Sequence, residues 1–274
     1  MTISSCFRKK RANDESGHSV PLSPESRERQ VGLYMKWAFF SLLIVLFCSL
    51  DCDTAFAAER GKSCAVVSTY AIRSLGSAIG TVNAKMSGSP ADNDLRADVD
   101  VKVRLLFFGF SLKSTETTSI RGGQVVLYSK TIDSGGKRRE IAGDLDGGIF
   151  TVVVRDGEKI ERKAFSTTDY QATNMEYPEV LLAPGEVRRM PVLDLENAEI
   201  VEREYRYVAE EQAEIGGRTT RIIVADFTDK NSECRRWTAI INGLPVVVRQ
   251  EGKEKTGLFN PSYSVRQTKA AIYP

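Results

Sequence analysis

Short runs of alternating apolar and polar residues are the feature that most constrains how this chain can fold. After residue 57 such runs, rich in Val, Ile, Thr, Tyr and Phe, recur about every ten to fourteen residues. Alternation with a period of two sends successive side chains to opposite faces of a β-strand, so that one face meets water and the other a core. We therefore predict strands near residues 64–73, 79–87, 95–107, 111–120, 124–132, 138–144, 150–155, 159–166, 188–195, 199–208, 219–227, 236–241, 246–250 and 262–272.

Tight turns separate the predicted strands. Five dipeptides supply the positive φ angles that hairpin turns need, namely Gly122-Gly123, Gly135-Gly136, Asp156-Gly157, Gly216-Gly217 and Asn242-Gly243. Residues 169–182 give the best helical pattern, but that pattern is short and poorly periodic. Many antiparallel strands in sequence order, with few helices, predict an all-β fold. It is either a meandering barrel or two packed sheets, since both arrangements remove exposed edges.

The N-terminal part of the chain predicts export. An apolar run from Trp37 to Leu50 follows Met35-Lys36 and precedes Ala55-Phe56-Ala57, the small-x-small pattern that signal peptidase cleaves. A membrane anchor is the alternative, but fourteen helical residues span only about 21 Å of a hydrocarbon core about 30 Å thick. We expect a signal peptide at residues 35–57, cleaved after Ala57, and a periplasmic protein. Residues 1–34 are then a disordered extension or precede the true start codon, and residues 58–274 form a single β-rich domain.

Composition and motifs argue against several classes of function. The 38 Lys and Arg residues nearly balance the 36 Asp and Glu residues, and the two signs are interleaved, so we expect no nucleic-acid partner. The only histidine, His18, precedes the predicted domain, which disfavours Ser-His-Asp and Cys-His catalysis and most zinc sites. No phosphate-binding loop or G-x-G-x-x-G pattern follows a predicted strand, so we expect no nucleotide, cofactor or metal.

Carboxylates are the remaining catalytic candidates. Asp144 with Asp146, and Glu202 with Glu204, lie two residues apart and share one face of a strand, where a glycosidase could hold its acid and its base. The same pattern is typical of the solvated face of an amphipathic strand, which is the interpretation we favour. We therefore expect that the protein is not an enzyme.

Cysteine usage agrees with an oxidising compartment. Cys64 and Cys234 are the only cysteines of the predicted domain. A disulfide between them would close a loop of about 170 residues and stabilise the fold by roughly 5 kcal/mol. The alternative is two buried thiols, because the sequence does not show whether the two Cα atoms approach within bridging distance.

One apolar run breaks the alternation. In Leu105-Leu106-Phe107-Phe108-Gly109-Phe110 large side chains fall on both faces, as in a strand that is buried on both sides or that lines a cavity mouth. Trp237 and the run Val246-Val247-Val248 allow the same two interpretations, core or cavity lining. Core packing is the plainer interpretation. The alternative is an apolar ligand pocket lined by Leu105, Phe107, Phe108, Phe110 and Trp237.

The chain resembles a family of uncharacterised bacterial exported proteins. The resemblance rests on Tyr70, Gly76, Ile79-Gly80-Thr81, Leu181-Leu182-Ala183-Pro184-Gly185, Val192-Leu193-Asp194-Leu195, Gly217 and Trp237 with Gly243-Leu244-Pro245, and spans most of residues 64–250. Through a relation in fold to LolA-like and LolB-like lipoprotein carriers, it implies a single antiparallel, strongly curved sheet that forms a half-barrel or barrel-like roll. The concave side of such a sheet could shelter acyl chains. Those carriers cap the cavity with helices, which are scarce here, so no carrier residue is transferred to this chain.

Together these features predict an exported, non-enzymatic periplasmic binding or carrier-like protein with an apolar cavity for a lipid-like ligand. The first alternative is an envelope structural or assembly protein that holds a protein partner at an exposed sheet edge or face. The second alternative is a carboxylate-based enzyme.

Overall fold

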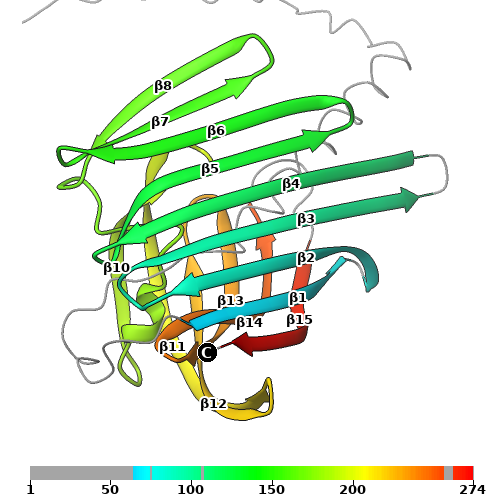
Figure 1. The fold of residues 1–274 in the computed structure, drawn as a ribbon, viewed down its shortest axis with the longest axis vertical. Coiled ribbons are helices and arrows are strands. Elements are labelled where there is room, and N and C mark those ends of the chain that lie inside the picture. The colour runs from blue at the N-terminus through cyan, green and yellow to red at the C-terminus, as the bar shows by residue number, and fades with distance from the viewer. Residues whose placement is uncertain (1–63, 75, 106–107, 256–261, 274) are drawn as a thin grey trace, which may run out of the picture.

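The structure, a computed structural model, describes residues 64–74, 76–105, 108–255 and 262–273. These residues form one sheet of fifteen strands in the order β8-β7-β6-β5-β4-β3-β2-β1-β15-β14-β13-β12-β11-β10-β9. Every neighbouring pair is antiparallel except β9 and β10, which run parallel. The predicted all-β fold, a curled sheet with a barrel-like shape, is confirmed (Figure 1). The predicted signal peptide and its cleavage site lie outside the described residues.

The first eight strands make a meander in which each strand pairs with the next. They are β1 (Cys64–Ser74), β2 (Ser77–Gly88), β3 (Asn93–Leu105), β4 (Phe108–Arg121), β5 (Gln124–Ser134), β6 (Lys137–Asp146), β7 (Ile149–Asp156) and β8 (Lys159–Ser166). Tight turns join β4 to β5, β5 to β6 and β7 to β8 at the predicted dipeptides. In the β4–β5 turn, Gly122 and Gly123 have φ angles of 60° and 83°, which glycine adopts without strain.

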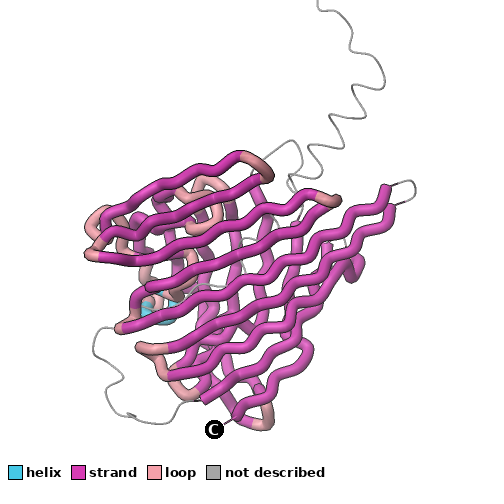
Figure 2. Tube along the Cα trace, turned by 45° about the horizontal axis from the view of Figure 1, so that its top comes forward, coloured by secondary structure: helices cyan, strands magenta, loops and turns pink. Residues whose placement is uncertain are grey.

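The remaining strands make a second layer. They are β9 (Ala172–Thr173), β10 (Val187–Asp194), β11 (Glu199–Ile215), β12 (Arg218–Thr228), β13 (Ser232–Ile241), β14 (Leu244–Glu254) and β15 (Ser262–Tyr273). Because β15 pairs with β1, the first and last strands join the two layers into one sheet. In Figure 1 the second layer lies behind the first and its strands run steeply across those of the first, and Figure 2 shows the same curl from another angle.

Strand β11 shows how the alternation in the sequence becomes two different faces. Val201, Arg203 and Tyr205 are buried, whereas Glu202 and Arg206 between them are exposed. The buried set faces the other layer and the exposed set faces solvent, as the alternation predicts. The core is therefore the space enclosed by the inner faces of both layers.

The connection between the two layers is an irregular segment. The helical pattern at residues 169–182 produces only β9 and a single 3-10 turn, η1 (Pro178–Leu181). Pro178 stands at the start of that turn, where its fixed φ suits a helix, and Pro184-Gly185 follows closely and prevents continuation. In the described part of the chain, no helix is long and apolar enough to cross a membrane.

Candidate functional site

The interior of the roll is occupied by the connection between the layers. We name residues 172–182 the plug segment, and its residues 172–179 are buried without interruption. The Glu176 carboxylate accepts hydrogen bonds from the backbone N–H groups of Thr173 (2.8 Å) and Val125 (3.4 Å). Asn174 Oδ1 accepts one from the N–H of Leu195 (3.0 Å). The plug segment is thus bonded to β5 on one side and to the β10–β11 turn on the other.

A buried ion pair attaches the plug segment to the second layer. Arg236 of β13 donates to Glu179 of η1 (2.9 Å) and to the side chain of Gln250 in β14 (3.0 Å). Its guanidinium also lies 5.4 Å from the ring centre of Tyr177 and 4.5 Å from that of Phe227. A charge this deeply buried is tolerated only when it is paired and hydrogen-bonded, and these contacts meet both conditions.

A second buried charge cluster lies at the β10–β11 turn. Lys130 of β5 donates to Glu196 of that turn and lies 3.6 Å from Glu116 of β4, which accepts a hydrogen bond from Tyr128 Oη (2.6 Å). Burial raises the pKa of Glu196 and of Asp194 above their ordinary values. Loss of solvation favours the neutral form of both buried carboxyl groups, Glu196 and Asp194.

The roll is closed at this turn by side chains rather than by strand pairing. β8 and β9 are the two edges of the sheet. Arg139 of β6 donates to the carbonyl of Glu196 (2.9 Å), and Lys163 of β8 donates to the carbonyl of Ala198 (3.0 Å). We name this contact between β6–β8 and residues 196–198 the seam. It joins β6 and the edge strand β8 to the β10–β11 turn without a ladder of backbone hydrogen bonds.

The predicted apolar pocket residues divide between core and surface. Phe110 is buried in the core of β4. Leu105 ends β3 and pairs with Phe108 at the start of β4, so the apolar run forms a hairpin end rather than one strand buried on both sides. Phe107 and the side chains of Leu105 and Phe108 lie outside the described residues.

Trp237 packs partly against the core and is partly covered by a surface arginine. It is half-buried on β13, and the guanidinium of Arg249 from β14 stacks over its ring at 4.3 Å. One cavity between the plug segment and the inner faces of β1, β2, β3 and β14 has a volume of about 10 Å³ and is lined by residues such as Tyr177, Tyr70 and Met86. That space accommodates no more than about one water molecule.

The predicted disulfide does not form in the structure, where Cys64 and Cys234 are both buried thiols. Strand register gives the reason. Cys234 pairs with Gly252, which pairs with Tyr263, which pairs with Ser74 at the end of β1, whereas Cys64 begins β1. Ten residues of strand separate the two ends by about 33 Å, far beyond the roughly 7 Å that a disulfide can bridge. Cys234 Sγ lies instead 3.1 Å from Tyr263 Oη.

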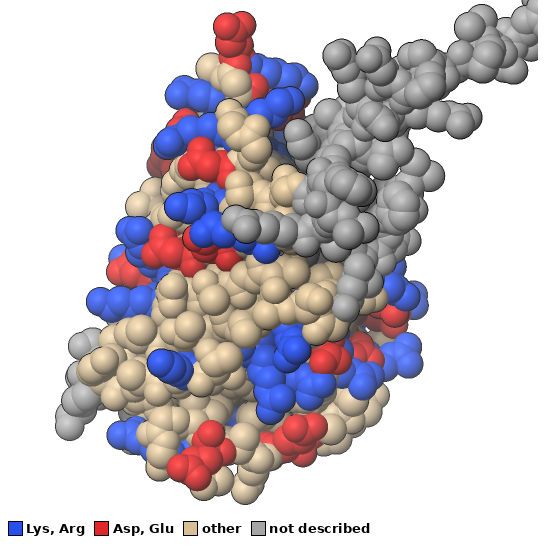
Figure 3. All heavy atoms as spheres, turned by 90° about the vertical axis from the view of Figure 1, so that its right-hand side faces the viewer, with Lys and Arg blue, Asp and Glu red and all other residues tan. Residues whose placement is uncertain are grey.

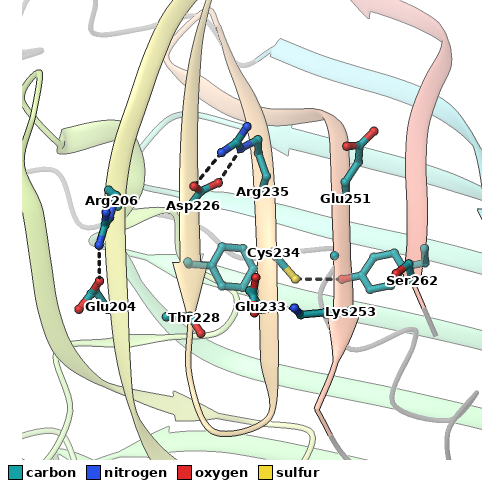
Figure 4. Close-up of a pocket in the computed structure, with 13 residues that line it drawn as sticks. Glu204, Arg206, Asp226, Thr228, Glu233, Cys234, Arg235, Glu251, Lys253 and Ser262 are labelled. Atoms are coloured by element: carbon teal, nitrogen blue, oxygen red, sulfur yellow. Dashed lines mark hydrogen bonds and ion pairs between the residues drawn. The ribbon is translucent and has the colours of Figure 1, made fainter. Parts of the chain in front are cut away.

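A trough of about 660 Å³ crosses the outer face of the second layer (Figure 4). Two rows of outward side chains border it. By strand register one row is Arg206, Asp226, Arg235 and Glu251, and the other is Glu204, Thr228, Glu233, Lys253 and Ser262. Its floor is the intervening row Phe227, Cys234, Gly252 and Tyr263. Four steps of about 4.8 Å between strands make the trough about 19 Å long.

Most of the charges that border the trough are paired with another border residue. Arg235 donates two hydrogen bonds to Asp226 (2.6 and 2.9 Å), which raise the pKa of Arg235. Lys253 lies 3.0 Å from Glu233. Exposed pairs of this kind contribute at most about 1 kcal/mol each, so they exchange readily for charges on a ligand.

The described residues contain neither a metal-binding group nor a histidine. The carboxylate pairs named as catalytic candidates lie on outer faces: Asp144 and Asp146 are exposed, and Glu204 is hydrogen-bonded to Arg189 and Arg206. These contacts lower the pKa of Glu204, Arg189 contributing most. A general acid needs a raised pKa, whereas the lowered pKa of Glu204 favours its ionised form.

Fold and site together define an all-β, barrel-like protein with a buried plug segment and a charged trough on its outer face. The chain belongs to the family described as "Domain of unknown function (DUF6134)", whose sequence profile matches residues 70–239. A comparison with curated proteins finds no match. Among solved structures, the chain is similar to a beta-barrel-like protein of the domain of unknown function DUF1849 from Brucella abortus. That similarity has a TM-score of 0.52 and 10% identity, and covers 77% of this chain and 98% of the other. At this identity the similarity shows the fold alone.

Proposed function

We propose that this protein is a non-enzymatic binding protein of the bacterial periplasm that holds an extended protein segment in its trough. Under this proposal the signal peptide at residues 35–57 directs export. The observation that carries the proposal is the pair of mixed-charge rows that border the trough on β11–β15.

The dimensions and the chemistry of the trough favour an extended peptide. An extended chain advances about 3.3 Å per residue, so about six residues span its length of about 19 Å. Both signs of charge stand on each border, since Asp226 lies beside Arg235 and Glu233 beside Lys253. A peptide with alternating acidic and basic side chains can replace these exposed pairs with pairs of its own. The aromatic side chains Phe227 and Tyr263 belong to the buried set, which disfavours a ligand that needs stacking.

A labelled hexapeptide of alternating Lys and Glu tests the proposal by fluorescence anisotropy. We expect saturable binding that weakens with salt and is lost in the double variant E233Q/R235Q, because that variant removes one charge from each border. The matched control is R138Q/E140Q, which removes an exposed ion pair from β6. Equal binding by both double variants, or equal binding of a Ser-Gly hexapeptide, would contradict the proposal.

Export is tested separately. The protein recovered from the periplasm should begin at Ala58 when its N-terminus is sequenced. A start at Met1 or Met35 would contradict cleavage after Ala57.

A second candidate function is transport of a lipid-like ligand inside the roll. One observation favours it: the seam is closed by Arg139 and Lys163 rather than by a strand ladder, so it can open without breaking backbone pairing. Apolar side chains then line the enclosed space on both layers, but the plug segment must leave before a ligand can enter. Solvent extraction of the protein from its native host, followed by mass spectrometry, should yield about one lipid per chain if this candidate is right and none if the interior stays filled.

A further inference from the structure

Three strands on the outer surface carry an unusual arrangement of basic residues. Arg249 of β14 stands directly opposite Arg266 of β15, which pairs with Ala71 of β1. Arg73, two residues along β1, and Lys269, three residues along β15, flank Arg266, and Arg73, Arg266 and Lys269 are exposed. Like charges directly opposite on neighbouring strands destabilise a sheet. This arrangement therefore needs an explanation outside the fold.

The protein itself supplies little acid to these residues. Glu251 accepts from Arg249 at 2.5 Å, and Arg73 donates to the backbone carbonyl of Gly76 at 3.2 Å. Within the ranges that the structure describes, no carboxylate forms an ion pair with Arg266 or Lys269. The contrast with the trough, where basic groups have acidic neighbours, indicates that this patch is arranged for anions from elsewhere.

Apolar and aromatic side chains border the basic patch. Val67 of β1 is 37% exposed and Tyr273 of β15 is 52% exposed. Strand register places both on the same face as Lys269, because Thr69 pairs with Lys269, Val67 with Ala271, and Ala65 with Tyr273. Figure 3 shows one side of the molecule, where groups of Lys and Arg lie next to uncharged areas and Asp and Glu occur at several places. We name Arg73, Arg249, Arg266 and Lys269, with Val67 and Tyr273 beside them, the basic face.

We propose that the basic face docks the protein onto a membrane surface that contains anionic phospholipids. Basic residues are drawn to anionic headgroups, and exposed Tyr and aliphatic side chains suit the boundary between headgroups and acyl chains. The sheet presents these groups on neighbouring strands about 4.8 Å apart, so that several can contact one surface together. This docking does not depend on the peptide that the trough binds.

Vesicle sedimentation tests the docking. The wild-type chain and its variants share the same N-terminus, so any contribution of residues 1–63 to vesicle binding is common to all of them. We expect binding to vesicles that contain phosphatidylglycerol, no comparable binding to phosphatidylcholine alone, and a loss of binding at high salt. Each basic residue near an anionic surface contributes about 1 kcal/mol, which is roughly fivefold in affinity. R266Q should therefore weaken binding about fivefold, and R73Q/R266Q about 25-fold.

The matched control is R138Q/R155Q, which removes two exposed arginines from β6 and β7 and should leave binding unchanged. Equal binding by R73Q/R266Q and wild type would overturn the proposal. Binding of soluble poly-glutamate as tight as that of the vesicles, with the same dependence on Arg266, would also overturn it and assign the face to an acidic protein. Because all four substituted residues are exposed, thermal melts should show that every variant remains folded.

Discussion

Arg235 and Arg236 are neighbours in β13, but the structure holds them in opposite ways. Arg235 is 46% exposed and pairs with Asp226, which is 38% exposed, at the border of the trough. Arg236 is 1% exposed and pairs with Glu179, which is fully buried, against the plug segment. One residue of shift along a strand thus moves an arginine from a surface that can exchange partners to an interior that cannot.

Arg236 represents charges that maintain the fold, and Arg235 represents charges that are available for binding. An exposed pair gains little, because water solvates both groups almost as well. A buried pair replaces the water that both groups lost, so removing one member leaves the other charged and unsolvated. The inner clusters of Arg236 and Lys130 are therefore structural, whereas the trough and the basic face can give up their contacts without unfolding the protein.

The largest effect should come from breaking the inner pair. Arg236→Met keeps the apolar stem but leaves Glu179 buried without its cation, and we expect a loss of about 3–5 kcal/mol in the free energy of unfolding. Arg235→Gln on the outer face should cost no more than about 1 kcal/mol. Urea unfolding followed by circular dichroism measures both. Similar losses in the two variants would remove the distinction between the faces.

A smaller effect should follow from adding one carbon to the inner face beneath the trough. A Cβ on Gly252 would lie 2.5 Å from Cys234 Sγ and 2.9 Å from the backbone oxygen of Glu233. We expect Gly252→Ala to cost about 1–3 kcal/mol, because overpacking forces neighbours to shift. Gly109→Ala is the control, since a Cβ there meets nothing within 4 Å. Equal urea midpoints for the two variants would show that Cys234 and Tyr263 have room to move.

The two faces should also respond differently to pH. Burial raises the pKa of Glu196 above 4.5 in the folded state, so the folded protein holds a proton that the unfolded chain releases. The stability this confers is complete below the ordinary pKa and is lost as the pH rises through the raised value. The outer carboxyl of Glu204 has a lowered pKa, and its contribution has the opposite sign: it is present above 4.5 and is lost as the pH falls.

Urea titrations from pH 4.5 to 8 measure this difference. No histidine of the described chain titrates in that range, so shifted carboxyl groups dominate the slope. We expect wild type to lose stability relative to Glu196→Gln as the pH rises, and Glu204→Gln to run parallel to wild type above pH 6. If the difference between wild type and Glu196→Gln were constant with pH, the carboxyl of Glu196 would be ionised throughout.

The sequence predicts the outer face better than the inner one. Turns such as Asn242-Gly243 are local, and in the structure both residues have the positive φ that the sequence implies. The alternation of exposed and buried residues in β11 likewise depends only on neighbouring residues of the sequence. The sequence indicates the inner charges less clearly. Lys130 occupies one of the alternating apolar positions of β5, between Tyr128 and Ile132, and a lysine at such a position needs an acidic partner.

The partners themselves are too distant in sequence for such a search. Lys130 and Glu196 are 66 residues apart, and Arg236 and Glu179 are 57 apart. The pairing of β1 with β15 and the burial of the plug segment likewise depend on how the layers meet. The two-residue strand β9 has no periodic pattern to detect. Local alternation therefore predicts strands and turns, while the filling of the interior follows from contacts that only the complete fold creates.

The smallest effect should come from a reducing agent. Cys64 and Cys234 are both buried thiols. Cys64 begins β1, whereas the strand register aligns Cys234 of β13 with the other end of β1. Dithiothreitol should therefore leave the urea midpoint unchanged. Alkylation of the denatured protein without prior reduction, followed by peptide mapping, should find each cysteine modified. A disulfide between them would instead make the midpoint fall on reduction, by up to roughly 5 kcal/mol in stability. It would also require the end of β1 that carries Cys64 to leave its pairing with β2 and reach β13. Unmodified cysteines would therefore overturn the strand register as well as the thiol assignment.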